Sequence, residues 1–280
     1  MQTVCLITPP SPFVLDERVF ISLGLLRVAA CLEQAGHPVE HLDLNGVADF
    51  ETILKNHAVV SRATVFGLTA TTPQMPTAAR IVAVLRAERP DARVVLGGPH
   101  ATLVHAAARK EKKAGRWGRA RRALSQLVAL FDVVVAGDGE DAIFEAVRPD
   151  APKIVDADDP SGLLFLTNKR YGEMPYPARH LVDVSSYHYS LEGVPAISLI
   201  AQLGCPFACA FCGGRSSPML RKIRTRTTES IVGEVRHLHE EYGVRGFMFF
   251  DDELNVNKSV VGLMDAIADL ADGLGVEFKL

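Results

Sequence analysis

Thr3-Val-Cys-Leu-Ile-Thr8 has the pattern of a strand. A helix pattern follows it at 25–36, with the sequence Leu-Leu-Arg-Val-Ala-Ala-Cys-Leu-Glu-Gln-Ala-Gly. Within 25–36 the apolar residues recur at helical spacing, and a glycine ends the run. Further β-branched, apolar runs, most of them separated by helical patterns, lie at 39–43, 64–69, 93–96 and 132–136. Strands that alternate with helices form parallel sheets. The sequence therefore predicts an α/β fold that begins with a Rossmann-like, doubly wound sheet of five parallel strands.

Composition places the chain among ordinary globular proteins of about two domains. It has 280 residues, of which 48% are hydrophobic and 22% charged, and its net charge is −3. This charge gives no reason to expect a nucleic-acid partner or an anionic membrane surface. The amino terminus has no basic leader, and no apolar run approaches the roughly 18 residues of a membrane span. We therefore expect a cytoplasmic protein without a membrane span.

The carboxyl ends of the five predicted strands are the expected ligand site, because doubly wound sheets bind ligands there. Small, hydroxyl and glycine residues at these ends allow a ligand to approach the backbone closely. Any one of these turns also occurs in unrelated sheets, so the prediction depends on the whole set. The candidate ligand-binding residues are Thr8, Pro9, Asn45, Thr69, Thr71, Thr72, Gly97, Gly98, His100, Gly137, Gly139 and Glu140.

Three cysteines lie close together in Leu203-Gly-Cys205-Pro-Phe-Ala-Cys209-Ala-Phe-Cys212-Gly-Gly. Thiolates suit zinc or iron-sulfur centres, but structural zinc takes four ligands and no fourth cysteine or histidine follows at finger-like spacing. The spacing therefore predicts an iron-sulfur cluster with one open iron. A partial zinc site, or three small buried hydrophobic residues, remains the alternative. Cys5 and Cys31 differ from these three, because each lies in an apolar pattern that indicates a core position.

The carboxyl-terminal part of the chain has the pattern of further strands and helices. Strands are predicted at Ala196–Leu203, 246–250 and Val276–Leu280, and Thr228 is expected to cap a helix that ends at Gly243. Asp251 and Asp252 follow the second of these strands. Carboxylates at that position either face a catalytic site or cap the next helix, and the sequence favours neither.

A basic stretch surrounds the single tryptophan of the chain, Trp117. Residues 109–122 contain eight lysines and arginines. Charge runs usually face solvent, so we interpret the stretch as a solvated helical insertion, and contact with an acidic partner is the alternative.

The cysteine loop, placed after an apolar strand, resembles the cluster-binding loop of radical S-adenosylmethionine (radical SAM) enzymes. Most of 1–150 resembles the cobalamin-binding domain that precedes the radical core in one large subclass. That likeness rests on the order Pro-Pro, Leu-Leu-x-x-Ala-Ala-Cys-Leu-Glu-Gln-Ala-Gly, Gly-Gly-Pro-His-Ala-Thr and Gly-Asp-Gly-Glu. Pro-Tyr-Pro-Ala-Arg-His, at 175–180, resembles the connector of the same subclass.

The resemblance implies a cobalamin-binding domain at 1–150, a linker at 151–195 and the first three βα units of a radical SAM partial barrel at 196–280. Because the family's barrel has six strands, it also implies a truncated chain. Cys205, Cys209 and Cys212 would hold a [4Fe-4S] cluster whose fourth iron binds S-adenosylmethionine (SAM), with Asp251 and Asp252 beside the SAM pocket. The Asp-x-His-x-x-Gly motif of many cobalamin proteins is missing, which implies cobalamin without that histidine as lower cobalt ligand; His100 is expected at the ligand rim instead.

The implied function is that of a cobalamin-dependent radical SAM methyltransferase. In the family an electron reduces the cluster, SAM is cleaved to a 5′-deoxyadenosyl radical, and methylcobalamin supplies the methyl group. A flavodoxin or ferredoxin is the expected reducing partner, and the substrate a small molecule or natural product. Two alternatives remain: a cyclase, oxidoreductase or rearrangement enzyme of the same architecture, and a non-catalytic cofactor-binding fragment.

Overall fold

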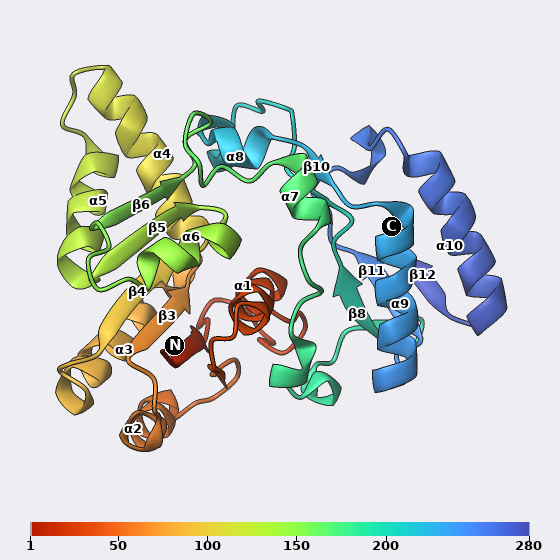
Figure 1. The fold of residues 1–280 in the computed structure, drawn as a ribbon, viewed down its shortest axis with the longest axis horizontal. Helices are drawn as coiled ribbons and strands as arrows, with labels where there is room; N and C mark the ends of the chain where they lie inside the picture. The colour runs from red at the N-terminus through yellow and green to blue at the C-terminus, as the bar shows by residue number, and fades with distance from the viewer. Residues whose placement is uncertain (1, 280) are drawn as a thin grey trace.

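The computed structural model describes residues 2–279, and its larger sheet contains six parallel strands in the order β2-β1-β3-β4-β5-β6. Figure 1 shows this sheet in the left half of the molecule. Its strands are β1 (Val4–Thr8), β2 (Val39–Asp43), β3 (Val65–Thr69), β4 (Arg93–Gly97), β5 (Val133–Gly137) and β6 (Ile154–Ala157). The order reverses between β1 and β3, so the sheet is doubly wound with its switch point at those two strands.

Helices cover both faces of this sheet, because alternate residues of its strands point to opposite faces. Val4 and Leu6 pack with one helical layer, while Cys5 and Ile7 pack with the other. The first layer is α1 (Leu23–Gln34) and α6 (Gly139–Ala146). The second contains α2 (Phe50–Val60), α3 (Met75–Glu88), α4 (Pro99–Lys113) and α5 (Arg119–Leu130), and a 3₁₀ turn, η1 (Thr72–Gln74), precedes α3.

The sixth strand is the main difference from the sequence prediction, which gave five. β6 lies in 151–195, the stretch predicted to be a linker, and it pairs with β5. Its Ile-Val-Asp-Ala pattern is short and contains a carboxylate, so it has too little apolar periodicity to indicate a strand. The rest of this stretch, up to residue 193, contains only short elements, which are α7 (Asn168–Gly172), η2 (Arg179–Leu181), η3 (Val184–Ser186) and β7 (Ser190–Leu191).

The second sheet has the order β12-β11-β8-β7 and lies on the right in Figure 1, beyond α1. β8 (Val194–Leu199), β11 (Gly246–Phe249) and β12 (Glu277–Lys279) are parallel, and β7 is antiparallel to β8. α9 (Thr228–Tyr242) and α10 (Val260–Leu274) follow β8 and β11 in the chain, and η5 (Leu254–Val256) precedes α10. Apolar residues of both helices pack on the strands. Leu280 lies outside the described residues.

Two local predictions in this half need correction. The strand predicted over Ala196–Leu203 breaks after Leu199, and Gln202–Leu203 forms a separate strand, β9, antiparallel to β10 (Arg224–Thr225). The helix predicted to start at a Thr228 cap is capped by Thr227, whose hydroxyl accepts a hydrogen bond from the Ser230 amide at 3.2 Å. Both errors are boundary errors, which local sequence patterns define poorly.

The basic stretch forms the end of α4 and the start of α5, with a break between them at residues 114–118. Trp117 is exposed, and the Arg121 guanidinium lies 4.3 Å from its ring centroid. The stretch is thus helical on both sides of a turn. Among residues 2–279, no helix is both long and apolar enough to cross a membrane.

Candidate functional site

A cavity of about 740 Å³ lies at the carboxyl ends of β1, β3, β4 and β5, at the switch point of the larger sheet. Its volume falls in the range of about 300–1,000 Å³ that is usual for small-molecule and cofactor sites. Predicted candidates that line it are Thr8, Asn45, Thr69, Thr71, Gly97, Gly98, Gly137, Gly139 and Glu140. Pro9, Thr72, His100, Asp251 and Asp252 are outside this lining.

Two glycines of the cavity lining let neighbouring strand ends approach each other closely. Gly98 precedes α4 with φ +89°, and a Cβ on it would lie 2.4 Å from Thr69 Oγ1. Gly137 ends β5 with φ +102°, and its Cβ would lie 2.4 Å from the carbonyl carbon of Ala157. A side chain at either position would be strained and would displace neighbouring atoms. The two turns therefore need glycine for the sheet to keep its shape at the cavity.

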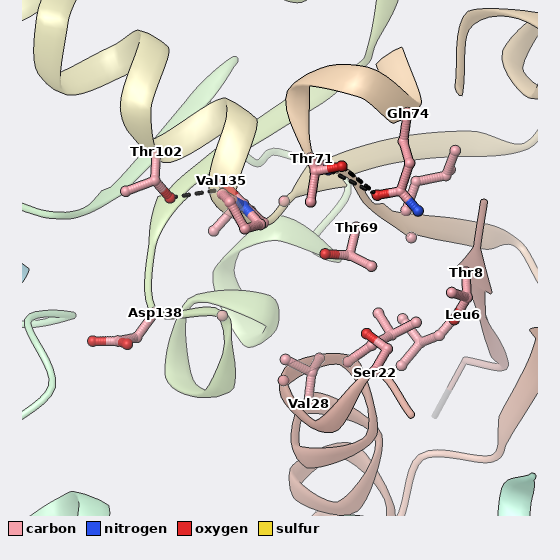
Figure 2. Close-up of a pocket in the computed structure, with 18 of the residues that line it drawn as sticks. Leu6, Thr8, Ser22, Val28, Thr69, Thr71, Gln74, Thr102, Val135 and Asp138 are labelled. Atoms are coloured by element: carbon pink, nitrogen blue, oxygen red, sulfur yellow. Dashed lines mark hydrogen bonds between the residues drawn. The ribbon is translucent and has the colours of Figure 1, made fainter. Parts of the chain in front are cut away.

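The first turns of α1 form a wall of the cavity that the sequence patterns did not reveal. Figure 2 shows Ser22 and Val28 of this region on the side of the pocket opposite to Thr69, Thr71 and Gln74. Gly24 also lines the cavity, and a Cβ built on it meets nothing within 4 Å. A side chain at residue 24 would therefore extend into the open space of the cavity.

Hydroxyl groups of the lining are available to a polar ligand. Within the part of the chain that the structure describes, the hydroxyls of Ser22 and Thr69 have no protein hydrogen-bond partner, although both line the cavity. Other polar lining groups are held in place: the Gln74 amide donates to the Pro9 carbonyl oxygen at 2.7 Å and accepts from the Thr71 amide at 2.9 Å. A cavity with apolar walls, small residues and oriented amide and hydroxyl groups fits a large cofactor rich in amide groups, such as cobalamin.

None of the nine histidines lines the cavity. His100 accepts or donates a hydrogen bond at 2.9 Å with the Thr72 hydroxyl, and partial burial lowers its pKa. This placement agrees with the missing Asp-x-His-x-x-Gly motif. A cobalt bound in the cavity as it stands would have no histidine of the lining as its lower ligand.

The remaining wall of the cavity comes from the second half of the chain. Leu203, Met219, Leu220 and Phe250 line it, and Phe250 stacks on Phe20 of the first half with ring centroids 4.9 Å apart. Leu203 lies two residues before Cys205. The cysteine loop and the cavity therefore share a wall.

The cysteine loop is anchored to this wall through its backbone. The Cys205 amide donates to the Leu220 carbonyl oxygen at 2.9 Å, and Gly204, at φ +84°, lies so close to the Lys222 carbonyl that a Cβ would lie 2.2 Å from that oxygen. Arg221 donates to the Pro206 carbonyl at 2.8 Å. Leu220 and Arg221 lie in a short helix, α8 (Pro218–Arg221), which follows a 3₁₀ turn, η4 (Gly213–Ser216), and Lys222 comes directly after α8.

The three thiols are unpaired and accessible. Cys205 is partly buried, Cys209 and Cys212 are exposed, and none is in a disulfide. Among the described residues, the three sulfur atoms of the loop do not all lie within 4.8 Å of one another.

Two buried carboxylates of the first half hold the cysteine-loop segment in place. Asp158, which follows β6 and is 0% exposed, accepts from Ser217 Oγ at 2.5 Å, the Met219 amide at 2.9 Å and Arg109 Nη2 at 2.7 Å. Asp138, which follows β5 and lines the cavity, forms an ion pair with the guanidinium of Arg224 in β10. Burial and the nearby Glu140 raise the pKa of Asp138 to about 7, against the opposing effect of Arg224.

Replacing Asp158 by Ala is expected to lower the free energy of unfolding by about 3 kcal/mol, because it leaves the Ser217 hydroxyl and the Met219 amide buried without an acceptor and removes the ion pair with Arg109. Urea unfolding measures this change. Asp150→Ala is the matched control: its carboxylate also binds an arginine, Arg148, at 2.8 Å but is 70% exposed, so we expect a much smaller loss than for Asp158→Ala. Equal losses would show that Asp158 is not an anchor.

Asp251 has a positioning role, which differs from the two roles considered from the sequence, facing a catalytic site or capping the next helix. Its carboxylate accepts from the amides of Ala201 and Gln202 at 3.2 and 2.5 Å, so it fixes the turn between β8 and the cysteine loop. Glu253 occupies the N-cap position of η5 and Ser259 that of α10, so neither Asp251 nor Asp252 is a helix cap. Asp252 is exposed.

Burial raises the pKa of Asp251 to about 6, which predicts a pH dependence of stability. In the unfolded chain this carboxyl titrates near about 4, so between these values the folded state binds more protons. Its contribution to the free energy of unfolding is therefore highest below about pH 4 and falls as the pH rises through about 6. Urea unfolding from pH 4 to 7 should show a smaller decline in Asp251→Asn than in the unchanged protein; parallel curves would contradict the assignment.

Comparisons with known proteins agree with this arrangement. Residues 17–128 match the B12 binding domain, and residues 199–279 match the radical SAM superfamily. An uncharacterized methyltransferase of Pyrococcus horikoshii is 28% identical over 276 residues, which cover 92% of this chain and 55% of the relative. An anaerobic magnesium-protoporphyrin IX monomethyl ester cyclase of Cereibacter sphaeroides is 27% identical over 208 residues, covering 68% of this chain and 30% of the cyclase.

Solved structures share the fold at lower identity. The radical SAM methyltransferase TsrM of Kitasatospora setae, solved with its tryptophan substrate and a SAM analogue, has a TM-score of 0.65 at 19% identity, covering 98% of this chain and 52% of TsrM. The cobalamin-dependent radical enzyme OxsB, with aqua-cobalamin bound, has a TM-score of 0.68 at 15% identity, covering 99% and 38%. The chain thus spans about half the length of the P. horikoshii relative and of TsrM.

Proposed function

Because the chain belongs to the cobalamin-binding radical SAM family, we propose that it serves a methyl-transfer reaction that uses a [4Fe-4S] cluster, SAM and cobalamin. The observation that carries this proposal is the wall shared by the cavity and the cysteine loop. Leu203 and Leu220 line the cavity, and the same short segments contain or bind Cys205. A cofactor in the cavity and a cluster on the loop would then face one reaction space.

Each part of the chain has a separate task in this proposal. Cys205, Cys209 and Cys212 bind the cluster as thiolates, and the glycine, hydroxyl and amide groups of the cavity hold cobalamin. When bound, the cluster would supply the electron and cobalamin the methyl group, since radical chemistry belongs to the cofactors. Leu203, Met219, Leu220 and Phe250 form an apolar wall that keeps water from the reaction space. Asp138, Asp158 and Asp251 are positioning residues that fix the loop against the cavity.

The substrate class we propose is a small molecule, on the basis of the tryptophan bound to TsrM. The electron needed to reduce the cluster is proposed to come from a flavodoxin or ferredoxin. The magnesium-protoporphyrin ester cyclase among the relatives supports a second candidate function, a radical cyclisation on the same architecture.

Product analysis tests the methyl-transfer proposal and separates it from cyclisation. Reconstituted protein is incubated without oxygen with dithionite, cobalamin, candidate small molecules beginning with tryptophan, and SAM labelled in its methyl group. Methyl transfer places the label on the acceptor and yields S-adenosylhomocysteine. An acceptor that changes while 5′-deoxyadenosine forms, with neither label transfer nor S-adenosylhomocysteine, would favour cyclisation and contradict our proposal.

A further inference from the structure

A second group of potential metal ligands lies in the first half of the chain, away from the cavity lining and the cysteine loop. It consists of Cys5 on β1, Glu40 on the neighbouring β2 and His57 on α2. One ligand atom of each residue lies within 4.8 Å of the other two. Cys5 was predicted as a core residue, and it is fully buried, but its thiol faces a histidine rather than apolar groups alone. None of the three residues lines the cavity, so the proposed function does not use them.

Their distances suit a single small cation. His57 Nε2 lies 3.5 Å from Cys5 Sγ and 3.0 Å from Glu40 Oε2, so one nitrogen faces both of the other ligand atoms. Zinc binds sulfur at about 2.3 Å and nitrogen or oxygen at about 2.0–2.2 Å, and tetrahedral ligands at these bond lengths are about 3.3–3.6 Å apart. The observed separations need only a small adjustment of the Glu40 side chain to meet this geometry.

The backbone and the neighbouring side chains already orient the carboxylate. Ser61 Oγ donates to Glu40 Oε2 at 2.5 Å, and the Arg62 amide donates to Glu40 Oε1 at 3.2 Å. Cys5 and Glu40 are fixed by the parallel pairing of β1 with β2, in which Cys5 is directly opposite Glu40. Groups that hold a ligand in place in this way are typical of built metal sites.

Charge and access also favour a divalent cation. A thiolate and a carboxylate carry two negative charges that a divalent cation neutralises, and the imidazole binds in its neutral form. The side chains of Glu40 and His57 are 26% and 25% exposed, so an ion can enter from their side and keep a water as its fourth ligand. Binding deprotonates Cys5, and that proton is released to solvent.

We propose that Cys5, Glu40 and His57 form a zinc site on the first sheet, separate from the cluster and the cavity. Sulfur, nitrogen and oxygen ligands together suit zinc better than magnesium or calcium, which prefer oxygen alone. The site joins two strands and the helix after β2, so bound zinc stabilises this edge of the sheet.

The test uses the full chain with Cys205, Cys209 and Cys212 all replaced by Ala, so that the loop thiols cannot bind the added metal. Zinc is titrated against a chromophoric chelator, and cobalt(II) is then added in its place. We expect one zinc per chain at micromolar concentration, and a cobalt complex with the thiolate charge-transfer absorption and intense visible bands of four-coordinate cobalt.

Variants in this background assign the ligands. His57→Ala and Glu40→Gln should each weaken zinc binding more than 10-fold, and Cys5→Ala should remove the thiolate band. His180→Ala is the matched control, because His180 also pairs with a glutamate, Glu33, at 3.0 Å but has no cysteine beside it. His57 and Glu40 are partly exposed, so their variants should fold even if Cys5→Ala does not, and circular dichroism checks this. Absence of stoichiometric zinc, a cobalt complex without a thiolate band, or equal affinity in His57→Ala and His180→Ala would overturn the proposal.

Discussion

Replacing Cys209 by Ala is expected to abolish the iron-sulfur cluster, as are Cys205→Ala and Cys212→Ala. Each removes one of three thiolates that hold the cluster, and the loop offers no replacement: its other residues between Leu203 and Gly214 are glycine, alanine, proline and phenylalanine. Reconstitution without oxygen, iron and sulfide analysis, and low-temperature electron paramagnetic resonance measure the result. We expect about four irons per chain in the unchanged protein and almost none in the variants.

Cys31→Ala is the control for this series. Cys31 is 2% exposed and packs in a small core cluster with Leu166, Tyr171 and Met174, so its loss should cost some stability but no iron. A full complement of iron in Cys209→Ala, or loss of iron in Cys31→Ala with the fold intact, would contradict the assignment of the cluster to the loop.

The strands and helices of the first half were largely predictable because their signals are local. β2 has the predicted bounds, and the predicted starts and ends of β1, β3, β4 and β5 differ from the structure by no more than one residue. β1, β3, β4 and β5 are mainly apolar runs between turn residues, as expected for strands buried on both faces, whereas β2 is a partly exposed edge strand with three polar residues. β6 was missed because it is short and contains Asp156, so it becomes a strand only through pairing with β5.

The candidate site was only half predictable for a similar reason. Residues at the carboxyl ends of parallel strands meet at one edge, so Thr8, Thr69, Gly97 and Gly137 could be grouped from the sequence. The residues of the opposite wall could not be grouped from the sequence. Leu203, Met219 and Phe250 are ordinary apolar residues, and their place depends on how the two halves of the chain pack. The hydrogen bonds of Asp158 and Asp251 could not be predicted for the same reason, because each carboxylate accepts from residues about 50 to 60 positions away.

The cysteine loop was recognisable from its spacing alone, but its attachment was not. Gly204 has a positive φ because its backbone approaches Lys222, and that contact joins two segments 18 residues apart in the sequence. A glycine beside a cysteine indicates a turn, while the partner of that turn becomes visible only in the folded chain.

Gly24→Leu is expected to prevent cobalamin binding while leaving the fold and the cluster intact. Gly24 lies in the first turn of α1 and lines the cavity, and a Cβ built on it meets no atom within 4 Å. A leucine side chain there therefore extends into the cavity without a clash in the unliganded protein, and it occupies space that the cofactor needs. We expect cobalamin affinity to fall more than 100-fold, which corresponds to about 2.7 kcal/mol of binding free energy.

Gly262→Leu provides the matched control. Gly262 lies in the first turn of α10, is exposed, and also has no atom within 4 Å of its added Cβ, but it is not part of the cavity. Leucine is a better helix former than glycine, so neither variant should be less stable than the unchanged protein, and lost binding in Gly24→Leu cannot be attributed to unfolding. Cobalamin titration followed by absorbance compares the two, with iron content measured in parallel. Equal cobalamin affinity in both variants would mean that cobalamin binds elsewhere on the chain or not at all.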